Sequence, residues 1–404
     1  MKSLRLLALV ILAAASIAEA CTVAVVSGKC TPDGRPLLWK HRDTDELQNA
    51  LQFFKGERYS FIGLVDTRGP MRDGVWIGAN SAGFAIMNSN SYNLVGQDTV
   101  SVKDREGILM RLALGRCATV DEFEALLREL EKPLGVEANF GVIDARGGAA
   151  FFEVDHFRAT RLDANDPKIA PFGYIVHTNF SFTGDPDRGS GHIRFATATE
   201  LFARAYETGA LTPKFILQEC SRCLTHSLTG TDLHALGGET AEGTTFVPFE
   251  DFIPRHSSSA SVVIQGVRPD EPPDHTTLWA IVGSPLTSVV TPVWVAAGSE
   301  LPRSVVAGSD SAAPICNKAL VLKERLFPLK RSYGERYMNL PAAFNREGSG
   351  TLQRLKPVED AILEEASQRM DRIRQGANLE REARAFYEWL DETLDREYQR
   401  LFGL

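Results

Sequence analysis

The sequence predicts an α+β protein, in which runs of β-strands alternate with pairs of helices. Short segments rich in β-branched and aromatic residues, bounded by Gly, Pro and Asp, are typical of strands. Segments with apolar residues spaced three and four apart are typical of helices. Because several strands follow one another before each pair of helices, the order favours stacked layers of sheet and helix over repeated strand–helix–strand units.

The first two expected strands form a hairpin. The β-branched run 22–26 predicts a buried strand, the segment 31–36 supplies Pro, Asp and Gly for a turn, and the chain returns as a strand over 37–40. Further strands are expected at 60–66, 75–79, 83–87, 139–144, 149–154, 173–178, 261–265 and 277–282. Helices are expected at 106–117, 120–130, 193–206 and 213–224, and one long charged helix at 355–402.

The first twenty residues have the pattern of a secretory signal peptide. Lys2 and Arg5 precede an apolar run over 6–15 that is too short to span a bilayer, and Ala18 and Ala20 are small where signal peptidase selects its site. We expect cleavage between Ala20 and Cys21, which gives a secreted or periplasmic protein beginning with a cysteine. Two other fates of this cysteine are a lipoprotein anchor and a disulfide.

Composition excludes several classes of partner. The formal net charge of the 404 residues is −8, with no basic run, so neither nucleic acid nor an anionic membrane surface is expected as a partner. No second apolar stretch is long enough to cross a membrane. Cys220 and Cys223, followed by His226 and His234, raise a zinc site as an alternative, but the loose histidine spacing and an oxidising compartment weigh against it. We therefore expect no metal and no cofactor.

A cysteine at the start of a mature chain is suited to amide hydrolysis. Its α-amine has an ordinary pKa near neutrality, so it can accept the thiol proton without a histidine partner. The thiolate then attacks a carbonyl, and the resulting oxyanion needs fixed hydrogen-bond donors. If Cys21 is the working thiol, an odd number of cysteines remains, which does not favour a disulfide scaffold.

Several motifs resemble those of one group of enzymes. Cys21-Thr22, Asp33-Gly34 and the stretch Lys40-His41-Arg42-Asp43 are similar to the opening of N-terminal nucleophile hydrolases of the choloylglycine hydrolase, penicillin V acylase and isopenicillin N acyltransferase group. Four later stretches, in the order found in these families, extend the resemblance to about Val295: 80–84, 139–153, 177–180 and 191–195.

The resemblance implies a four-layer αββα sandwich over 21–303. Beyond it no motif matches, but the sequence loses strand character and becomes helical, so we expect a helical C-terminal extension over 304–404 that packs on this domain or mediates association between copies. The resemblance also implies the site residues. The expected catalytic residues are Cys21, Asp43, Asn88 or Asn90 on the oxyanion, Asn179 and Arg194; those expected to bind substrate are Lys40 and Arg42.

Two departures from the family pattern leave the substrate undefined. Lys40 stands where these families have arginine, which replaces a planar bidentate donor with a point charge, and His41 stands where asparagine is usual.

The leading hypothesis is hydrolysis of a linear C–N amide of a small molecule through a Cys21 thioester. The alternatives are acyl transfer of the isopenicillin N acyltransferase type, a dipeptidase-like hydrolase, and a non-catalytic lipid-anchored binding protein.

Overall fold

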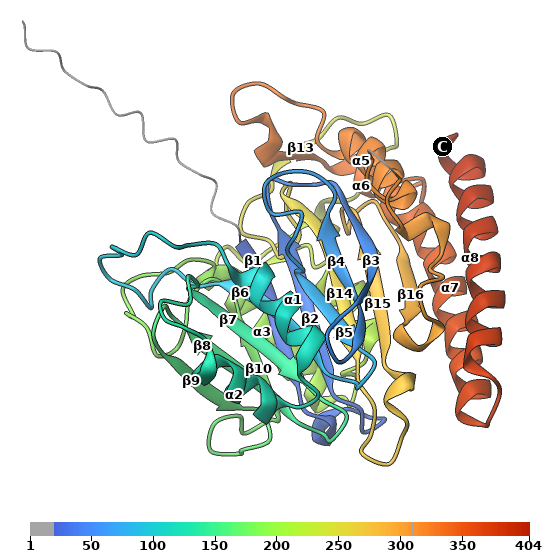
Figure 1. The fold of residues 1–404 in the computed structure, drawn as a ribbon. Helices are drawn as coiled ribbons and strands as arrows, with labels where there is room; N and C mark the ends of the chain where they lie inside the picture. Colours follow the sequence, from blue (N-terminus) through green and yellow to red (C-terminus); the bar gives the residue numbers. More distant parts are fainter. Residues whose placement is uncertain (1–19, 309–310) are drawn as a thin grey trace, which may run out of the picture.

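The computed structural model describes residues 20–308 and 311–404, so the expected signal peptide lies outside the described residues except for Ala20. Two large antiparallel sheets face each other, and helices cover the outer face of each (Figure 1). Strands of both sheets contact one another across the interface, most closely where β1 and β2 meet β6 and β7.

The six-stranded sheet carries the start of the chain. Its strands, in spatial order, are β10 (Tyr174–His177), β1 (Ala20–Val26), β2 (Leu37–Asp43), β14 (Ser258–Gln265), β15 (Thr277–Val282) and β16 (Val290–Trp294). The predicted hairpin is confirmed, because β1 and β2 pair antiparallel with Cys21 opposite Arg42. The second strand runs unbroken to Asp43, three residues further than expected.

The seven-stranded sheet is a meander in which each strand pairs with the next along the chain. It consists of β3 (Asn49–Lys55), β4 (Ser60–Asp66), β5 (Ile77–Asn80), β6 (Ala85–Asn90), β7 (Ala138–Ile143), β8 (Ala149–Val154) and β9 (Ala159–Asp163). Two small pairs lie outside the main sheets: β11 (Thr225–His226) with β12 (Thr231–Asp232), and β13 (Phe246–Pro248) with β17 (Tyr337–Asn339).

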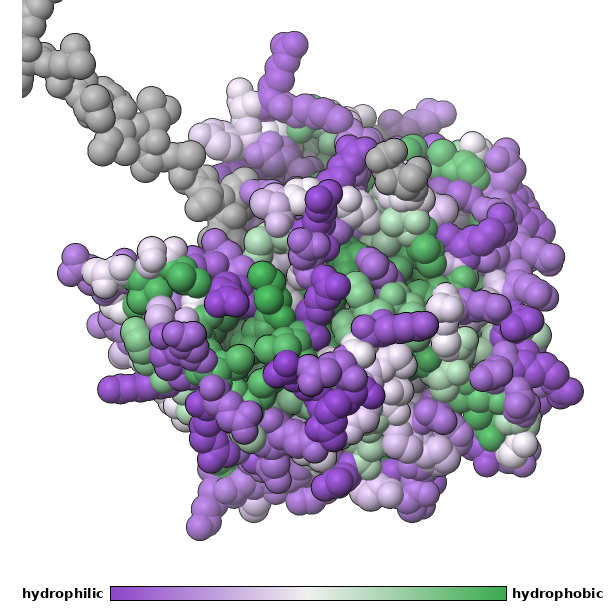
Figure 2. Space-filling view, viewed as in Figure 1, coloured by the Kyte–Doolittle hydropathy of each residue, from purple (hydrophilic) through white to green (hydrophobic). Residues whose placement is uncertain are grey.

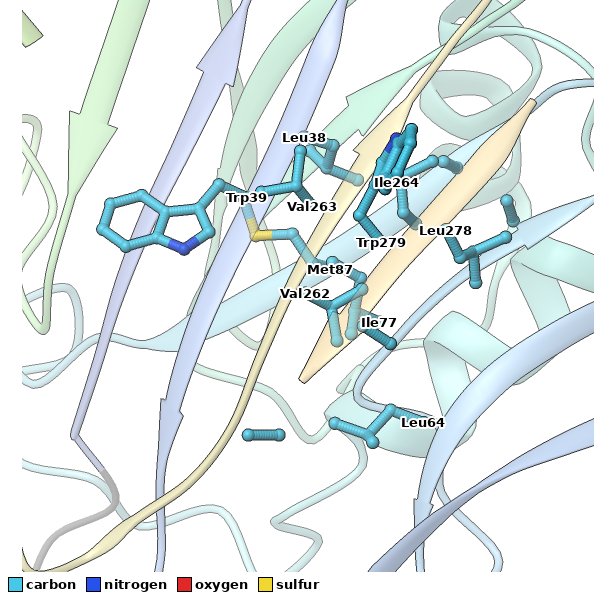
Figure 3. Close-up of a cluster of buried hydrophobic side chains, with 14 of the residues drawn as sticks. Leu38, Trp39, Leu64, Ile77, Met87, Val262, Val263, Ile264, Leu278 and Trp279 are labelled. Atoms are coloured by element: carbon cyan, nitrogen blue, oxygen red, sulfur yellow. The ribbon is translucent and has the colours of Figure 1, made fainter. Parts of the chain in front are cut away.

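Apolar side chains of both sheets form the central core. Figure 3 shows residues of β2, β14 and β15 beside residues of β4, β5 and β6, among them Leu38, Met87 and Val262, all buried. The sheets approach so closely at Gly141 of β7 that a Cβ there would lie 2.8 Å from Val25 and 3.2 Å from Leu38 of the facing sheet. Burial of this apolar surface is the main stabilising contribution to the sandwich.

Helices complete the outer layers, as the resemblance implied. On the seven-stranded sheet, α1 (Glu106–Arg116) contacts β4 to β6, and Phe123 of α2 (Val120–Glu129) packs against Phe140 and Phe152. On the six-stranded sheet, Phe202 of α3 (His192–Glu207) stacks on Trp39. The helix expected over 213–224 is shorter: α4 (Pro213–Phe215) passes into a π-helical turn over Ile216–Cys220.

The C-terminal region consists of α5 (Pro314–Leu326), α6 (Leu340–Ala343), α7 (Thr351–Arg374) and α8 (Leu379–Phe402). The prediction of one long helix over 355–402 is wrong. The chain breaks at Gly376, whose φ of 101° is accessible to glycine but strained for other residues, and α8 returns along α7. Both helices contact β16, where Tyr387 accepts a hydrogen bond from the main-chain N–H of Trp294.

Charged and polar side chains dominate the viewed surface, interrupted by smaller apolar areas (Figure 2). Over the described residues, no helix combines the length and apolar character that crossing a membrane requires. The same residues gather no group of three His, Cys, Asp or Glu side chains suited to a metal ion, and all six cysteines are free thiols.

Candidate active site

Cys21 lies near the start of β1, between β10 and β2, with only 4% of its surface exposed. Residues directly opposite each other in an antiparallel pair project to the same face of the sheet, so Cys21 shares a face with Arg42. Arg42 reaches Asp66 of the seven-stranded sheet. The thiol therefore belongs to the face between the two sheets, at the end of the sandwich where the chain begins.

Asn179 and Arg194 hold the main chain of Cys21. The Cys21 N–H donates to Asn179 Oδ1 at 3.0 Å, and Arg194 Nη2 donates to the same oxygen at 2.9 Å. Arg194 Nη1 donates to the Cys21 carbonyl oxygen at 2.7 Å and to Thr22 Oγ1 at 2.9 Å. Three of the predicted site residues are thus joined in one buried network.

Local structure places these two side chains. Asn179 lies two residues after the end of β10 and pairs with Ser190 in an isolated β-bridge, and its Nδ2 donates to the Asn90 carbonyl oxygen at 2.9 Å. Arg194 lies in the first turn of α3, after Gly191 with a φ of 84°; a Cβ at Gly191 would lie 2.4 Å from Arg194 Nη2. Burial and the nearby charge of Arg255 lower the pKa of Arg194 to about 10, so the guanidinium remains charged at neutral pH.

Asp43 lies on the opposite face of β2 and forms a second cluster, which we call the outer cluster: Asp43, His41, Ser258 and Arg255. Arg255 and Ser258 Oγ each donate to the Asp43 carboxylate at 2.6 Å. Burial, the largest single effect, raises the pKa of this carboxyl, but Arg255, His41, Arg194 and Ser258 together outweigh burial and hold the pKa below its usual value. Arg255 also donates to the Ala20 carbonyl oxygen at 3.3 Å, beside the expected cleavage point.

Three predicted residues, Lys40, Arg42 and Asn88, form a third group with Asp66 and Trp76, which we call the inter-sheet cluster. Lys40 Nζ donates to Asn88 Oδ1 at 2.7 Å. Arg42 binds Asp66 with both terminal nitrogens at 2.6 and 3.0 Å, and its guanidinium lies 4.5 Å from the Trp76 ring. These contacts favour a sheet-bridging role for Arg42, and contact of Lys40 or Arg42 with substrate stays a prediction.

The choice between Asn88 and Asn90 for the oxyanion also stays open. Asn88 is buried and donates from Nδ2 to Asn90 Oδ1 at 3.2 Å, whereas Asn90 is half-buried. Asn93, the third asparagine of this segment, fixes the loop after Asn179 by accepting from the Ser181 N–H and donating to the Ser181 and Asp185 carbonyl oxygens. That position is structural.

Sequence reasoning missed Arg255 and Ser258. Both contact Asp43 because β14 pairs with β2, a contact between segments more than 200 residues apart, and neither carries a local motif. The missed pair lies with Asp43 on the face of the six-stranded sheet that points away from the seven-stranded sheet.

A cavity of about 430 Å³ lies elsewhere, between α3, the segment 218–225 and α7, and none of the predicted site residues lines it.

Comparison with known proteins confirms the resemblance read from the motifs. The sequence model of the family described as acyl-coenzyme A:6-aminopenicillanic acid acyl-transferase, within the N-terminal nucleophile hydrolase superfamily, matches residues 32–193. The matched segment contains Lys40, Asp43, Asn88, Asn90 and Asn179, and ends just before Arg194. No curated protein gives a significant match.

Solved structures similar to this chain share little sequence with it. An N-acylethanolamine-hydrolyzing acid amidase ortholog from Caenorhabditis elegans is 16% identical, with 62% of this chain and 94% of that chain covered and a TM-score of 0.41. A variant of conjugated bile acid hydrolase from Clostridium perfringens is 11% identical (68% and 92% covered, TM-score 0.39). Penicillin V acylase from Agrobacterium tumefaciens is 14% identical (70% and 87% covered, TM-score 0.35).

Proposed function

We propose that the protein is a secreted cysteine amidohydrolase that cleaves a linear C–N amide bond of a small molecule through a thioester on Cys21. The observation that carries the proposal is the network in which Asn179 Oδ1 accepts from both the Cys21 nitrogen and Arg194. After removal of the leader, that nitrogen becomes an α-amine on the same residue as the thiol. The amine is then a base of suitable pKa, held in a fixed position.

In the proposed mechanism the amine takes the thiol proton and the thiolate attacks the amide carbonyl. The tetrahedral oxyanion is stabilised by side-chain amides, for which Asn179 and Asn88 or Asn90 are the candidates. The proton passes to the leaving amine, the acyl group remains on Cys21 as a thioester, and water attacks it to release the acid. Arg194 donates to the Cys21 carbonyl oxygen and so holds the main chain that carries the thiol.

The test is turnover by processed protein. Purified secreted material is first sequenced from its N-terminus and weighed intact, to establish that it begins at an unmodified Cys21, and is then screened against a panel of N-acyl amides. We expect Cys21→Ala to abolish hydrolysis and Cys21→Ser to lose most of it, while Cys117→Ala, which alters another buried thiol, retains it. Undiminished turnover by Cys21→Ala, or an acylated Cys21 amine, would contradict the proposal.

Acyl transfer is the second candidate, favoured by the family whose sequence model matches residues 32–193. The two activities share the Cys21 thioester and differ in what resolves it. They are separated by adding increasing amounts of an amine to the reaction and measuring how the acyl group partitions between acid and new amide. A product ratio that stays with the acid at high amine concentration identifies a hydrolase.

A further inference from the structure

The cavity of about 430 Å³ lies between the sandwich and the C-terminal extension. Its walls are α3, the segment 218–225, which begins within the π-helical turn, and the first part of α7. α3 packs on the outer face of the six-stranded sheet, whereas the Cys21 thiol belongs to the face between the sheets. The cavity is therefore separate from the candidate active site, and all its lining residues follow the segment 32–193 that the family model matches.

Arg222 holds one wall of the cavity in place. Its Nε donates to the Pro285 carbonyl oxygen at 2.7 Å, and its terminal nitrogens donate to the two carboxylate oxygens of Glu359 at 2.7 and 2.6 Å. The same nitrogens reach the carbonyl oxygens of Leu217 and Ser288 at 3.4 and 3.1 Å. Because these contacts fix α7 against the π-helical turn and the loop before β16, the cavity is preformed, and its volume lies in the range of about 300–1,000 Å³ that is typical of small-molecule sites.

The inner lining favours an apolar occupant. Its apolar side chains are buried or half-buried, and they are Leu201, Leu224, Phe344, Leu352 and Leu355. The buried ion pair of Arg222 and Glu359 offers no free charge, because the Glu359 carboxylate also accepts from Gln218 and from the main-chain N–H of Val290. A charged group of a ligand would therefore lose its hydration inside this lining without gaining a counter-charge.

The rim of the cavity is polar and carries charges of both signs. Its charged and titratable side chains are exposed, and they are Arg204, Lys356, Glu200, Glu219 and His234. Lys356 is already paired with Asp360 at 2.8 Å, so the rim has no excess of positive charge that would attract an anion. Since water and salt screen exposed charges, these groups add little to the affinity for an ion, but they can form hydrogen bonds with an uncharged polar group.

We propose that this cavity is a second binding site, for an uncharged small molecule with an apolar body and one hydrogen-bonding group. The apolar lining removes the body of the ligand from water, which drives binding, and the rim bonds to the polar group. Because the occupant contacts both α3 and α7, its binding also stabilises the attachment of the C-terminal extension to the sandwich.

The test compares two fluorescent probes that share one aromatic body. N-phenylnaphthylamine is uncharged, and anilinonaphthalene sulfonate carries one negative charge. Each probe is titrated into the processed protein, and its dissociation constant is obtained from the rise in fluorescence. We expect N-phenylnaphthylamine to bind about ten times more tightly, because the sulfonate must lose hydration without gaining a counter-charge.

Two further measurements locate the bound probe. Leu352→Trp places a larger side chain in the cavity and is expected to weaken the binding of N-phenylnaphthylamine about tenfold, whereas Leu320→Trp, at a half-buried position of α5 outside the cavity, keeps it. Cys223 lines the cavity, so saturating probe is expected to slow its alkylation by iodoacetamide in the unmodified protein, as measured by peptide mass spectrometry. Alkylation of Cys30, a half-buried cysteine outside the cavity, is expected to be unchanged.

Equal affinities of the two probes, or tighter binding of the sulfonate, would overturn the proposed class of ligand. Unchanged binding in folded Leu352→Trp, or alkylation of Cys223 that the probe does not slow, would overturn the site. Leu352 has no part in the proposed amide hydrolysis, so Leu352→Trp is expected to turn over amides like the original protein. A protein that binds the probe in this way and hydrolyses no amide would contradict the proposed function and leave the second site standing.

Discussion

The two faces of β2 carry polar clusters that make different contacts: the inter-sheet cluster is fully buried, whereas Arg255 of the outer cluster is partly exposed. On the inner face, the inter-sheet cluster joins one sheet to the other through Arg42 and Asp66 and through Lys40 and Asn88. On the other face, the outer cluster contacts the Ala20 carbonyl oxygen through Arg255. The difference indicates that the inter-sheet cluster serves mainly stability, whereas the outer cluster and the Asn179–Arg194 pair position the start of the mature chain.

The largest expected effect lies in the inter-sheet cluster. Asp66→Asn leaves the Arg42 guanidinium buried without its carboxylate, and breaking a buried ion pair from one side typically costs about 3–5 kcal/mol. The free energy of unfolding, measured by urea denaturation, is expected to fall by this amount. Asp163→Asn is the control, since its ion pair with Arg161 is partly exposed and such pairs contribute about 0–1 kcal/mol.

An Asp66→Asn protein that is as stable as the original would break the comparison, because the inter-sheet cluster would then have no stabilising role to set against the outer one. A large loss of kcat in folded Asp66→Asn would also contradict it, because the inter-sheet cluster would then serve activity as well as stability.

Asn179→Ala is the next largest change and acts on activity. The substitution removes the acceptor of the Cys21 nitrogen and a candidate oxyanion donor, and loss of one such donor typically lowers kcat by about 10²–10³-fold. Kinetics on a responsive amide from the panel check this. Asn345→Ala, which removes a buried asparagine of the C-terminal region, is the matched control and is expected to alter stability but not kcat.

If Asn179→Ala and Asn345→Ala lowered kcat equally, Asn179 would be one structural asparagine among others, and the assignment of this network to function would fail.

The sequence predicted features that depend on neighbours along the chain. The hairpin of β1 and β2 was found because a β-branched run, a Pro-Asp-Gly turn and a second apolar run follow one another. The strand that precedes Asn179 was likewise predicted, over 173–178, from a local apolar run. The strand β16 was missed because it contains Pro292, and a proline within an apolar run argues against a central strand. The sheet accommodates Pro292 because β16 is an edge strand.

Features that depend on distant contacts could not be predicted. Arg255 and Ser258 reach Asp43 only because β14 pairs with β2. The break between α7 and α8 had a local signal, Gly376, but charged periodicity on both sides concealed it. The sequence therefore predicted site residues that belong to a recognisable motif, including Arg194 on α3 and Asn88 on β6, and missed Arg255 and Ser258, which carry no local motif.

The smallest expected effect is on the pH dependence of the free energy of unfolding, and it concerns His41 of the outer cluster. Burial lowers the pKa of His41 in the outer cluster to about 4 from its ordinary value of 6.5, so the folded protein binds fewer protons there than the unfolded chain. This contribution to stability is complete above about pH 6.5 and is lost as the pH falls towards 4. In His41→Gln, which can still bond to Ser258, the free energy of unfolding is expected to decline less over that range. The exposed His192→Gln is the control, and an identical decline in both variants would show that His41 does not control the acid sensitivity of the outer cluster.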